Sequence, residues 1–312
     1  MKKHFKDFIA TIVSITLSKT LVVLFFLLVI FYGVAYYENL MVDRAKESTL
    51  RDANLIVNEY NNQIDHVGQI AKVVSALPEV QAKDSAKCNQ ILHEFYGNDP
   101  DLSVVLVADT NGDSFCTSSP TPGISIADRA NFQNAIKNGK LSPGGFIIGK
   151  ITGIPAASYG YPYYDANHQL LGVVGIGLKI DAIQSFAQTL DENMDTQVTM
   201  VDYNDTILTS YPQNSAGTVG TKWNSADFGQ ALSNTDKSVV INDGSQMKLV
   251  RSFNRTRLGG VVVIVSSPVK SFFLFAADLL LKFYGYIIAA YFAALILAYL
   301  AKITFKIKIK NS

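Results

Sequence analysis

Each end of this chain carries a long apolar segment, and that arrangement limits what its 312 residues can fold into. No charged residue lies between Thr20 and Tyr37, a length at the short end of what crosses a bilayer as a helix. The second segment, Leu279–Ala301, has one charge, Lys282, near its end. We therefore predict transmembrane helices at 20–37 and within 271–301, with the chain between them folded in water.

Each segment has one alternative interpretation. The first is also compatible with a cleaved signal peptide, but the residues after it, AYYENLMVDRAKE, contain no cleavage site of small residues. The second is also compatible with a buried core helix, but it is long and apolar on every side. Both alternatives are therefore less favoured than a helix that spans the membrane.

Lysine residues predict the orientation in the membrane. They recur in residues 1–19 and in the tail 302–312, and basic residues next to a membrane helix favour the cytoplasmic side. We expect a two-pass protein of the inner (plasma) membrane, with both termini cytoplasmic and the basic tail at the lipid surface. Residues from about Glu38 to Asp278 would then lie outside, most simply in a periplasm. The net charge of +1 does not indicate a nucleic-acid partner.

Residues 38–78 predict a long stalk helix that ends at Pro78. Its apolar residues are spaced alternately by four and three, which is an a/d pattern over three heptads. One interpretation is that this seam packs on the protein's own sheets, and the other is that it pairs with a second copy in a homodimer. Both can hold along different parts of the helix. The seam consists of Ala53, Val57, Tyr60, Ile64, Val67, Ala71 and Val74.

Two similar segments predict an internal repeat. VVLVADTNGDSFCTSSP begins near residue 104 and VTMVDYNDTILTSYP near residue 198, and both have the pattern of a β-hairpin. Between them we expect a short helix around Phe132 that ends at Gly139, then strands at 144–152, 156–164 and 169–180, and a helix at 181–190. After the second hairpin we expect strands at 246–253 and 259–266. The fold class is therefore α+β with antiparallel sheets.

The order of several motifs resembles one known family. DRANFQNAI, GGFIIGKITGIP, YGYPYYD and LLGVVGIGLKI are together similar to the extracytoplasmic double Cache domain, which lies ahead of diguanylate cyclases, histidine kinases and chemoreceptors. The resemblance covers about Asn39 to Lys270. It implies two PAS-like modules: 79–190 far from the membrane and 191–270 close to it.

The resemblance also implies a disulfide. In a two-cysteine version of the domain, one cysteine begins the helix before the first strand and the other ends the hairpin strand. Cys88 and Cys116 occupy these places, and they are the only cysteines of the chain. An extracytoplasmic compartment would allow the bond to form, whereas two free thiols are the alternative.

The family places its ligand pocket in the module far from the membrane. By this resemblance Arg129 is the family arginine, whose planar guanidinium suits a carboxylate, and Phe132 is the family aromatic. Phe146, Tyr159 and Tyr161 are predicted to form the pocket walls, and the two tyrosines share one face of a strand. Alternatively, Arg129 pairs with its neighbour or bonds backbone carbonyls, Phe132 is a core residue, and the tyrosines fill the pocket.

Several positions depart from the amino-acid-binding members of the family. Ile124, Asn131 and Gly177 stand where those members have a tyrosine, a tryptophan and an aspartate, and Gly145 replaces a common acidic residue. Because no aspartate would hold an α-ammonium group, we expect a carboxylate or a neutral metabolite rather than an amino acid.

No pattern in the sequence indicates catalysis. The four histidines lack metal-ligand spacing, and phosphate loops, nucleophile elbows and paired carboxylates are not found. We therefore expect neither enzymatic activity nor a cofactor. The first hypothesis is a membrane-anchored small-molecule sensor without an output domain on this chain, which signals to a separate cytoplasmic partner. The alternatives are the truncated sensor half of a diguanylate cyclase or histidine kinase, and a periplasmic binding or scaffold protein that transmits nothing.

Overall fold

A computed structural model describes most of the chain between Lys2 and Lys270. The predicted second transmembrane segment, apart from a few positions, and the tail 302–312 lie outside the described residues. The described residues are 2–119, 123–188, 196–213, 217–223, 229, 233, 237–242, 247–258, 260–270, 281–282, 285–286 and 293.

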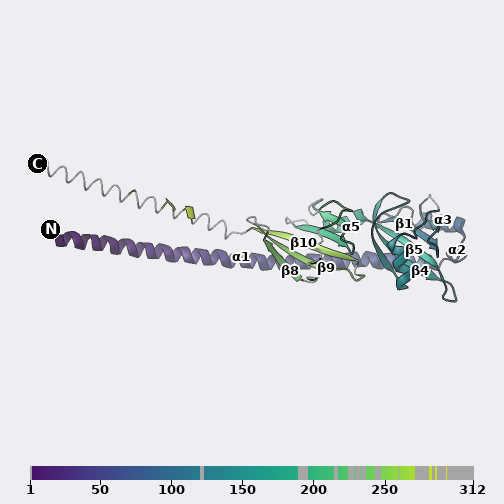
Figure 1. Ribbon diagram of the computed structural model, residues 1–312, viewed down its shortest axis with the longest axis horizontal. Helices are drawn as coiled ribbons and strands as arrows, with labels where there is room; N and C mark the ends of the chain where they lie inside the picture. Colours follow the sequence, from purple (N-terminus) through teal and green to yellow (C-terminus); the bar gives the residue numbers. More distant parts are fainter. Residues whose placement is uncertain are drawn as a thin grey trace. The chain divides into compact units, whose positions relative to one another are not determined.

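The described part contains five helices and ten strands (Figure 1). The helices are α1 (Lys2–Ser75), α2 (Pro78–Gln81), α3 (Ser85–Tyr96), α4 (Ala130–Asn138) and α5 (Ile180–Gln188). The first five strands are β1 (Leu102–Asp109), β2 (Ser114–Thr117), β3 (Ser142–Ile148), β4 (Pro155–Tyr164) and β5 (Leu170–Lys179). The remaining strands are β6 (Gln197–Asp202), β7 (Ile207–Tyr211), β8 (Lys237–Asn242), β9 (Met247–Arg255) and β10 (Val261–Lys270).

The early part of α1 exposes large apolar side chains in every direction. Phe25, Phe26 and Tyr32 are exposed by 62%, 60% and 75%, which in water would be unfavourable but suits contact with lipid. Among the described residues, the helical segment Val22–Ser75 is the one long and apolar enough to cross a membrane. The structure is therefore consistent with membrane anchoring at this end.

From Ala45 onward, α1 belongs to a compact unit that also holds both sheets. Every residue of the predicted seam is buried there, in one apolar core with side chains of both sheets. The first interpretation of the seam is thus confirmed for residues 53–74, which pack on the protein's own sheets. Pairing with a second copy is not tested. The helix ends at Ser75, close to the predicted Pro78, where α2 begins.

The internal repeat is confirmed by two five-stranded sheets with one topology. The strand order is β2-β1-β5-β4-β3 in the first sheet and β7-β6-β10-β9-β8 in the second, and the strand pairs described are antiparallel. This confirms the α+β class with two antiparallel sheets and is consistent with two PAS-like modules. β8 was not predicted, although turn residues flank its run KSVVI in the sequence, NTD before it and NDG after it.

Both faces of the first sheet are covered. α1 covers one face, and α4 lies against the other, in contact with β3 and β4. α4 ends as predicted at Gly139, whose positive φ of 63° is the left-handed conformation that glycine adopts easily at a helix end. The apolar face of α4 packs through Phe132 and Ala135 on Leu106 and Val173.

The predicted disulfide between Cys88 and Cys116 is present. It joins α3 to β2 over 28 positions of sequence, and both cysteines are buried. Next to it, Asn89 Oδ1 accepts a hydrogen bond of 2.8 Å from the backbone N–H of Thr117. The disulfide and this hydrogen bond together fix α3 at the edge of the first sheet.

Candidate functional site

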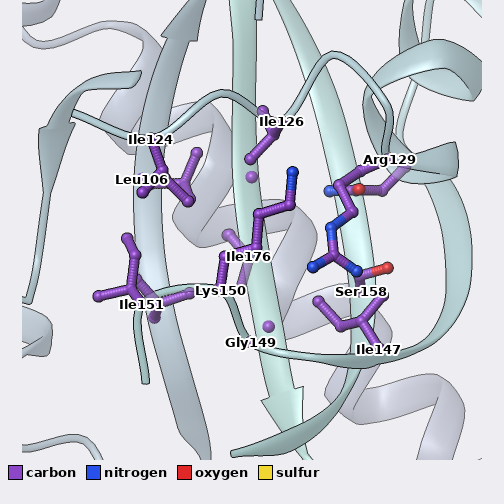
Figure 2. A pocket seen from close by; sticks show the side chains of 14 residues that line it. Leu106, Ile124, Ile126, Arg129, Ile147, Gly149, Lys150, Ile151, Ser158 and Ile176 are labelled. Atoms are coloured by element: carbon purple, nitrogen blue, oxygen red, sulfur yellow. The ribbon is translucent and has the colours of Figure 1, made fainter. Parts of the chain in front are cut away.

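A cavity opens between the first sheet and the loops around α4 (Figure 2). The empty space among its lining residues amounts to about 420 Å³, a value that includes open solvent at the mouth. Most of its wall is aliphatic, and a small number of polar groups lies among the aliphatic side chains, as in many small-molecule sites. The lining residues are Val104, Leu106, Ile124, Ile126, Arg129, Asn131, Ile147, Gly149, Lys150, Ile151, Ser158, Gly175, Ile176 and Gly177.

The floor of the cavity exists because two positions of β5 lack side chains. Gly175 pairs with Leu106 across the sheet, and Gly177 pairs with Val104. A Cβ at Gly175 would lie 3.1 Å from the Leu106 side chain, and larger groups would extend into the cavity. The alternation of β5 therefore leaves a hollow beside α4.

Arg129 is the residue before α4, and it lines the cavity. One of its guanidinium nitrogens donates a hydrogen bond of 3.2 Å to the carbonyl oxygen of Ile148. Arg129 thus bonds a backbone carbonyl, which is the alternative stated for it, and it also lines the cavity; its role in ligand binding stays a prediction. The beginning of α4 adds the positive end of a helix dipole to the same region.

Lys150 is a second cation at the cavity, and no sequence pattern indicated it. Its ammonium lies 2.6 Å from a carboxylate oxygen of Asp128 and donates to the carbonyl oxygen of Ser125 at 2.9 Å. The hydrogen bond from Lys150 lowers the pKa of the Asp128 carboxyl. These contacts tie the loop after β3 to the loop before α4, and Asp128 thus pairs with Lys150 rather than with Arg129.

Asn131 contributes a buried polar group to the cavity wall. Its Nδ2 donates to the carbonyl oxygen of Tyr159 at 3.1 Å, and the residue is 6% exposed. Its Oδ1 is buried and has no hydrogen-bond partner among the described residues. Nearby, the Ser158 hydroxyl donates to the carbonyl oxygen of Gly145 at 3.1 Å.

Three predicted aromatic residues lie away from the cavity. Phe132 is 6% exposed and belongs to the core under α4, which is the alternative stated for it. Tyr159 and Tyr161 do share one face of β4, but that face packs on the core with α1. The hydroxyls of Tyr159 and Tyr60 share a buried hydrogen bond of 2.8 Å. Ser158, on the opposite face of β4, lines the cavity instead.

Phe146, the fourth predicted aromatic, contacts the second sheet rather than the cavity. Its backbone N–H donates to Asp202 Oδ2 at 2.8 Å, and its ring lies against Gly220, where a Cβ would come within 2.9 Å. Gly145 has a φ of 73°, and a Cβ there would lie 2.6 Å from the same carboxylate. An acidic side chain at position 145 is therefore excluded by Asp202.

The structure thus keeps one of the five predicted ligand residues, Arg129, at the cavity. It adds Lys150 and Asn131, and it replaces the expected aromatic wall by an aliphatic one. A signal for this wall was present in the sequence as the isoleucines on both sides of the Arg129 motif, Ile124, Ile126, Ile147 and Ile151. Among the described residues there is no group of three His, Cys, Asp or Glu side chains that could hold a metal ion.

Solved structures with the same fold are extracellular sensor domains. The sensor domain of the V. cholerae histidine kinase DctB is 18% identical, with a TM-score of 0.52, and the match covers 74% of this chain and 98% of that chain. Methyl-accepting Chemotaxis protein X is 15% identical, with a TM-score of 0.54 and coverage of 75% and 99%. The ligand-binding domain of Campylobacter jejuni chemoreceptor Tlp3, in complex with L-norvaline, is 10% identical, with a TM-score of 0.54 and coverage of 74% and 92%.

No protein-family model and no curated protein matches the sequence. At the identities of the solved structures, the likeness concerns the fold. The part of the chain that they cover therefore has the fold of extracellular sensor domains of histidine kinases and chemoreceptors, consistent with the Cache-type sensor that the sequence resembles.

Proposed function

We propose that this protein is a membrane-anchored sensor whose first sheet binds a small organic anion outside the cell membrane. The observation that carries the proposal is the cavity, where an aliphatic wall meets the guanidinium of Arg129 and the ammonium of Lys150. Of these two cations, Lys150 is paired with Asp128, so one unit of positive charge is left to complement a ligand. A carboxylate with an apolar body fits this charge and this wall.

A contact series connects the cavity with the long helix. Asn131, in the wall, donates to the backbone of Tyr159, whose hydroxyl bonds Tyr60 of α1. We propose that a ligand draws α4 toward the floor of the cavity and so shifts these contacts against α1. α1 would transmit the displacement through the membrane to a separate cytoplasmic partner.

Binding is tested with the full-length protein in detergent micelles, by thermal shift and calorimetry with aliphatic monocarboxylates and dicarboxylates. We expect at least one carboxylate to raise the melting temperature in a concentration-dependent way. Arg129→Ala should weaken its binding by about tenfold or more, because a charge-assisted hydrogen bond is lost. The matched control is Arg51→Ala, since Arg51 is an exposed arginine of α1. Equal affinities of the two variants for the carboxylate would contradict the assignment of Arg129 to the ligand-binding site.

The two-pass arrangement is part of the proposal and needs its own test. We expect both termini in the cytoplasm and the two sheets outside, from the distribution of lysines. Alkaline phosphatase folds actively only outside the cytoplasm, so a fusion after Ser119 should be active and a fusion after Ser312 inactive. An active fusion after Ser312 would contradict the second membrane crossing.

A further inference from the structure

The Asn131 amide leaves one hydrogen-bond acceptor unused in the cavity wall. A carbonyl oxygen can only accept, so the amide nitrogen must face the carbonyl of Tyr159, and this fixes the orientation of the amide. The oxygen, Oδ1, is then buried and has no partner among the described residues. Buried acceptors without a partner are rare in folded proteins because they cost free energy. A ligand that donates a hydrogen bond would satisfy this oxygen, and because Oδ1 is fully buried, the donor group reaches it through a small movement of the cavity wall.

The charge around the cavity distinguishes between possible donors. The charged residues of the lining are Arg129 and Lys150, and the nearby carboxylate of Asp128 is 64% exposed and paired with Lys150. An ammonium group would enter a region with two cations and no lining carboxylate, which disfavours it. A ketone would place an acceptor against an acceptor. A hydroxyl is neutral and donates, so it fits Asn131 Oδ1.

The rest of the cavity distinguishes between possible hydrocarbon bodies. Leu106, Ile124 and Ile151 gather at the end of the cavity away from Arg129 and Ser158 (Figure 2). Their branched side chains form a non-planar wall, and no aromatic residue is part of the described lining. This surface fits a short branched alkyl group better than a flat ring.

We propose that the cavity selects branched aliphatic 2-hydroxy carboxylates. The carboxylate binds Arg129, the 2-hydroxyl donates to Asn131 Oδ1, and the alkyl group packs on Leu106, Ile124 and Ile151. The inference rests on the proposed function, namely that this cavity binds a small organic anion. It assigns to Asn131 the role of the residue that determines specificity.

The test compares four acids with one carbon skeleton by calorimetry on the full-length protein: 2-hydroxyisocaproate, isocaproate, 2-oxoisocaproate and leucine. We expect 2-hydroxyisocaproate to bind about tenfold more tightly than isocaproate, because one buried hydrogen bond is gained. We expect 2-oxoisocaproate and leucine to bind more weakly than isocaproate. Equal affinities of the hydroxy acid and isocaproate, or tightest binding of leucine or of the oxo acid, would overturn the proposal.

Two asparagine variants test whether Asn131 causes the preference for the hydroxy acid over isocaproate. Asn131→Ala should reduce the preference for the hydroxy acid to within about twofold, while isocaproate still binds. The matched control is Asn134→Ala, because Asn134 lies in the same helix and donates to the carbonyl oxygen of Pro143 at 2.9 Å but does not line the cavity. It should keep the full preference. A preference that survives in Asn131→Ala would overturn the role of Asn131.

The outcomes separate this inference from the proposed function. If isocaproate binds in a way that depends on Arg129 but the hydroxyl adds nothing, only the inference fails. If none of the four acids binds, the inference fails, and the wider carboxylate series then decides the proposed function. If Asn131→Ala does not fold, the four-acid series on the unaltered protein still gives the decision.

Discussion

In both sheets an aspartate ends the first strand of the hairpin, Asp109 in the first and Asp202 in the second. One carboxylate oxygen of each accepts hydrogen bonds from backbone N–H groups two and four residues later, at 2.9 and 3.0 Å for Asp109 and at 2.8 and 2.9 Å for Asp202. The two turns are therefore built in the same way. This common frame makes the positions of the two sheets comparable one by one.

The floors of the two sheets differ at corresponding positions. Gly175 of the first sheet corresponds to Ile264 of the second, since each pairs with the residue three before the turn aspartate. Ile126 likewise corresponds to Trp223, since each follows the residue that bridges to the hairpin. Ile264 and Trp223 are 2% and 8% exposed and belong to one apolar cluster, so two large buried side chains stand where the first sheet has Gly175 and Ile126.

The two turn aspartates differ in how deeply they are buried and in whether the second carboxylate oxygen bonds the other sheet. Asp202 is 1% exposed and accepts the N–H of Phe146 from the first sheet, whereas Asp109 is only partly buried. The same fold thus serves two purposes. The first sheet keeps a hollow, whereas the second, as far as its described residues show, has large buried side chains at the corresponding positions and receives the edge strand β3 of the first through Asp202.

We expect the largest effect from placing isoleucine at position 175 of the first sheet, because the second sheet has isoleucine, Ile264, at the corresponding position. Gly175→Ile should abolish binding of isocaproate, by about 1000-fold or ~4 kcal/mol, because the new side chain occupies the cavity. The backbone there needs no positive φ, and the nearest atoms belong to the movable side chain of Leu106. Calorimetry measures the binding, and circular dichroism checks that the variant folds. Full affinity in a folded Gly175→Ile protein would contradict the comparison.

The disulfide stabilises the first sheet alone, since the chain has no further cysteines. The double variant Cys88→Ala/Cys116→Ala should lose about 3 kcal/mol of unfolding free energy by the loop-entropy model. Urea denaturation of the full-length protein with and without dithiothreitol measures this. The reductant should lower the stability of the unaltered protein and leave that of the double variant unchanged.

The next effect separates the two aspartates. Asp202→Ala should cost about 2 kcal/mol, because the N–H of Phe146 and two turn N–H groups lose a buried acceptor. Asp109→Ala should cost about 1 kcal/mol, because it removes only the two turn bonds at a more exposed site. Urea denaturation compares the two variants. A larger cost for Asp109→Ala would reverse the roles assigned to the two turns.

The smallest effect concerns alkaline pH. Burial raises the pKa of the Tyr60 and Tyr159 hydroxyls above the usual value and that of Tyr163 to about 12. The folded state therefore favours the neutral phenols, and stability is kept below pH ~10 and falls above it, where the unfolded chain ionises. The Tyr60→Phe/Tyr159→Phe variant should show a smaller fall in melting temperature between about pH 9 and 11 than the unaltered protein. If the melting temperature of the variant falls as much as that of the unaltered protein, the buried Tyr60–Tyr159 pair is not the cause of the loss of stability at alkaline pH.

Much of the fold was predictable from local sequence. The two hairpins, the end of α4 at Gly139 and the end of α1 before Pro78 follow from turn residues, periodicity and helix stop signals, and each is observed. The disulfide followed from the family resemblance. These features depend on short stretches of sequence or on a motif order, and neighbouring residues suffice to specify them.

The site was less predictable because both faces of β4 are buried. Alternation places Tyr159 and Tyr161 on one face and Ser158 on the other, but it does not say which face α1 covers. The aromatic residues were assigned to the cavity, and the opposite face lines it. The tertiary contact between Phe146 and Asp202 joins residues far apart in the sequence, and no local pattern specifies it.

We propose that the first sheet, and not the second, holds the ligand. A branched aliphatic carboxylate that carries a diazirine can be photolysed with the full-length protein, and its adducts mapped by mass spectrometry. We predict adducts on peptides that contain Ile124, Ile151 or Ile176, and their loss in Gly175→Ile. Adducts that lie mainly on β6–β10, or that persist in the Gly175→Ile protein, would place the ligand outside the cavity of the first sheet.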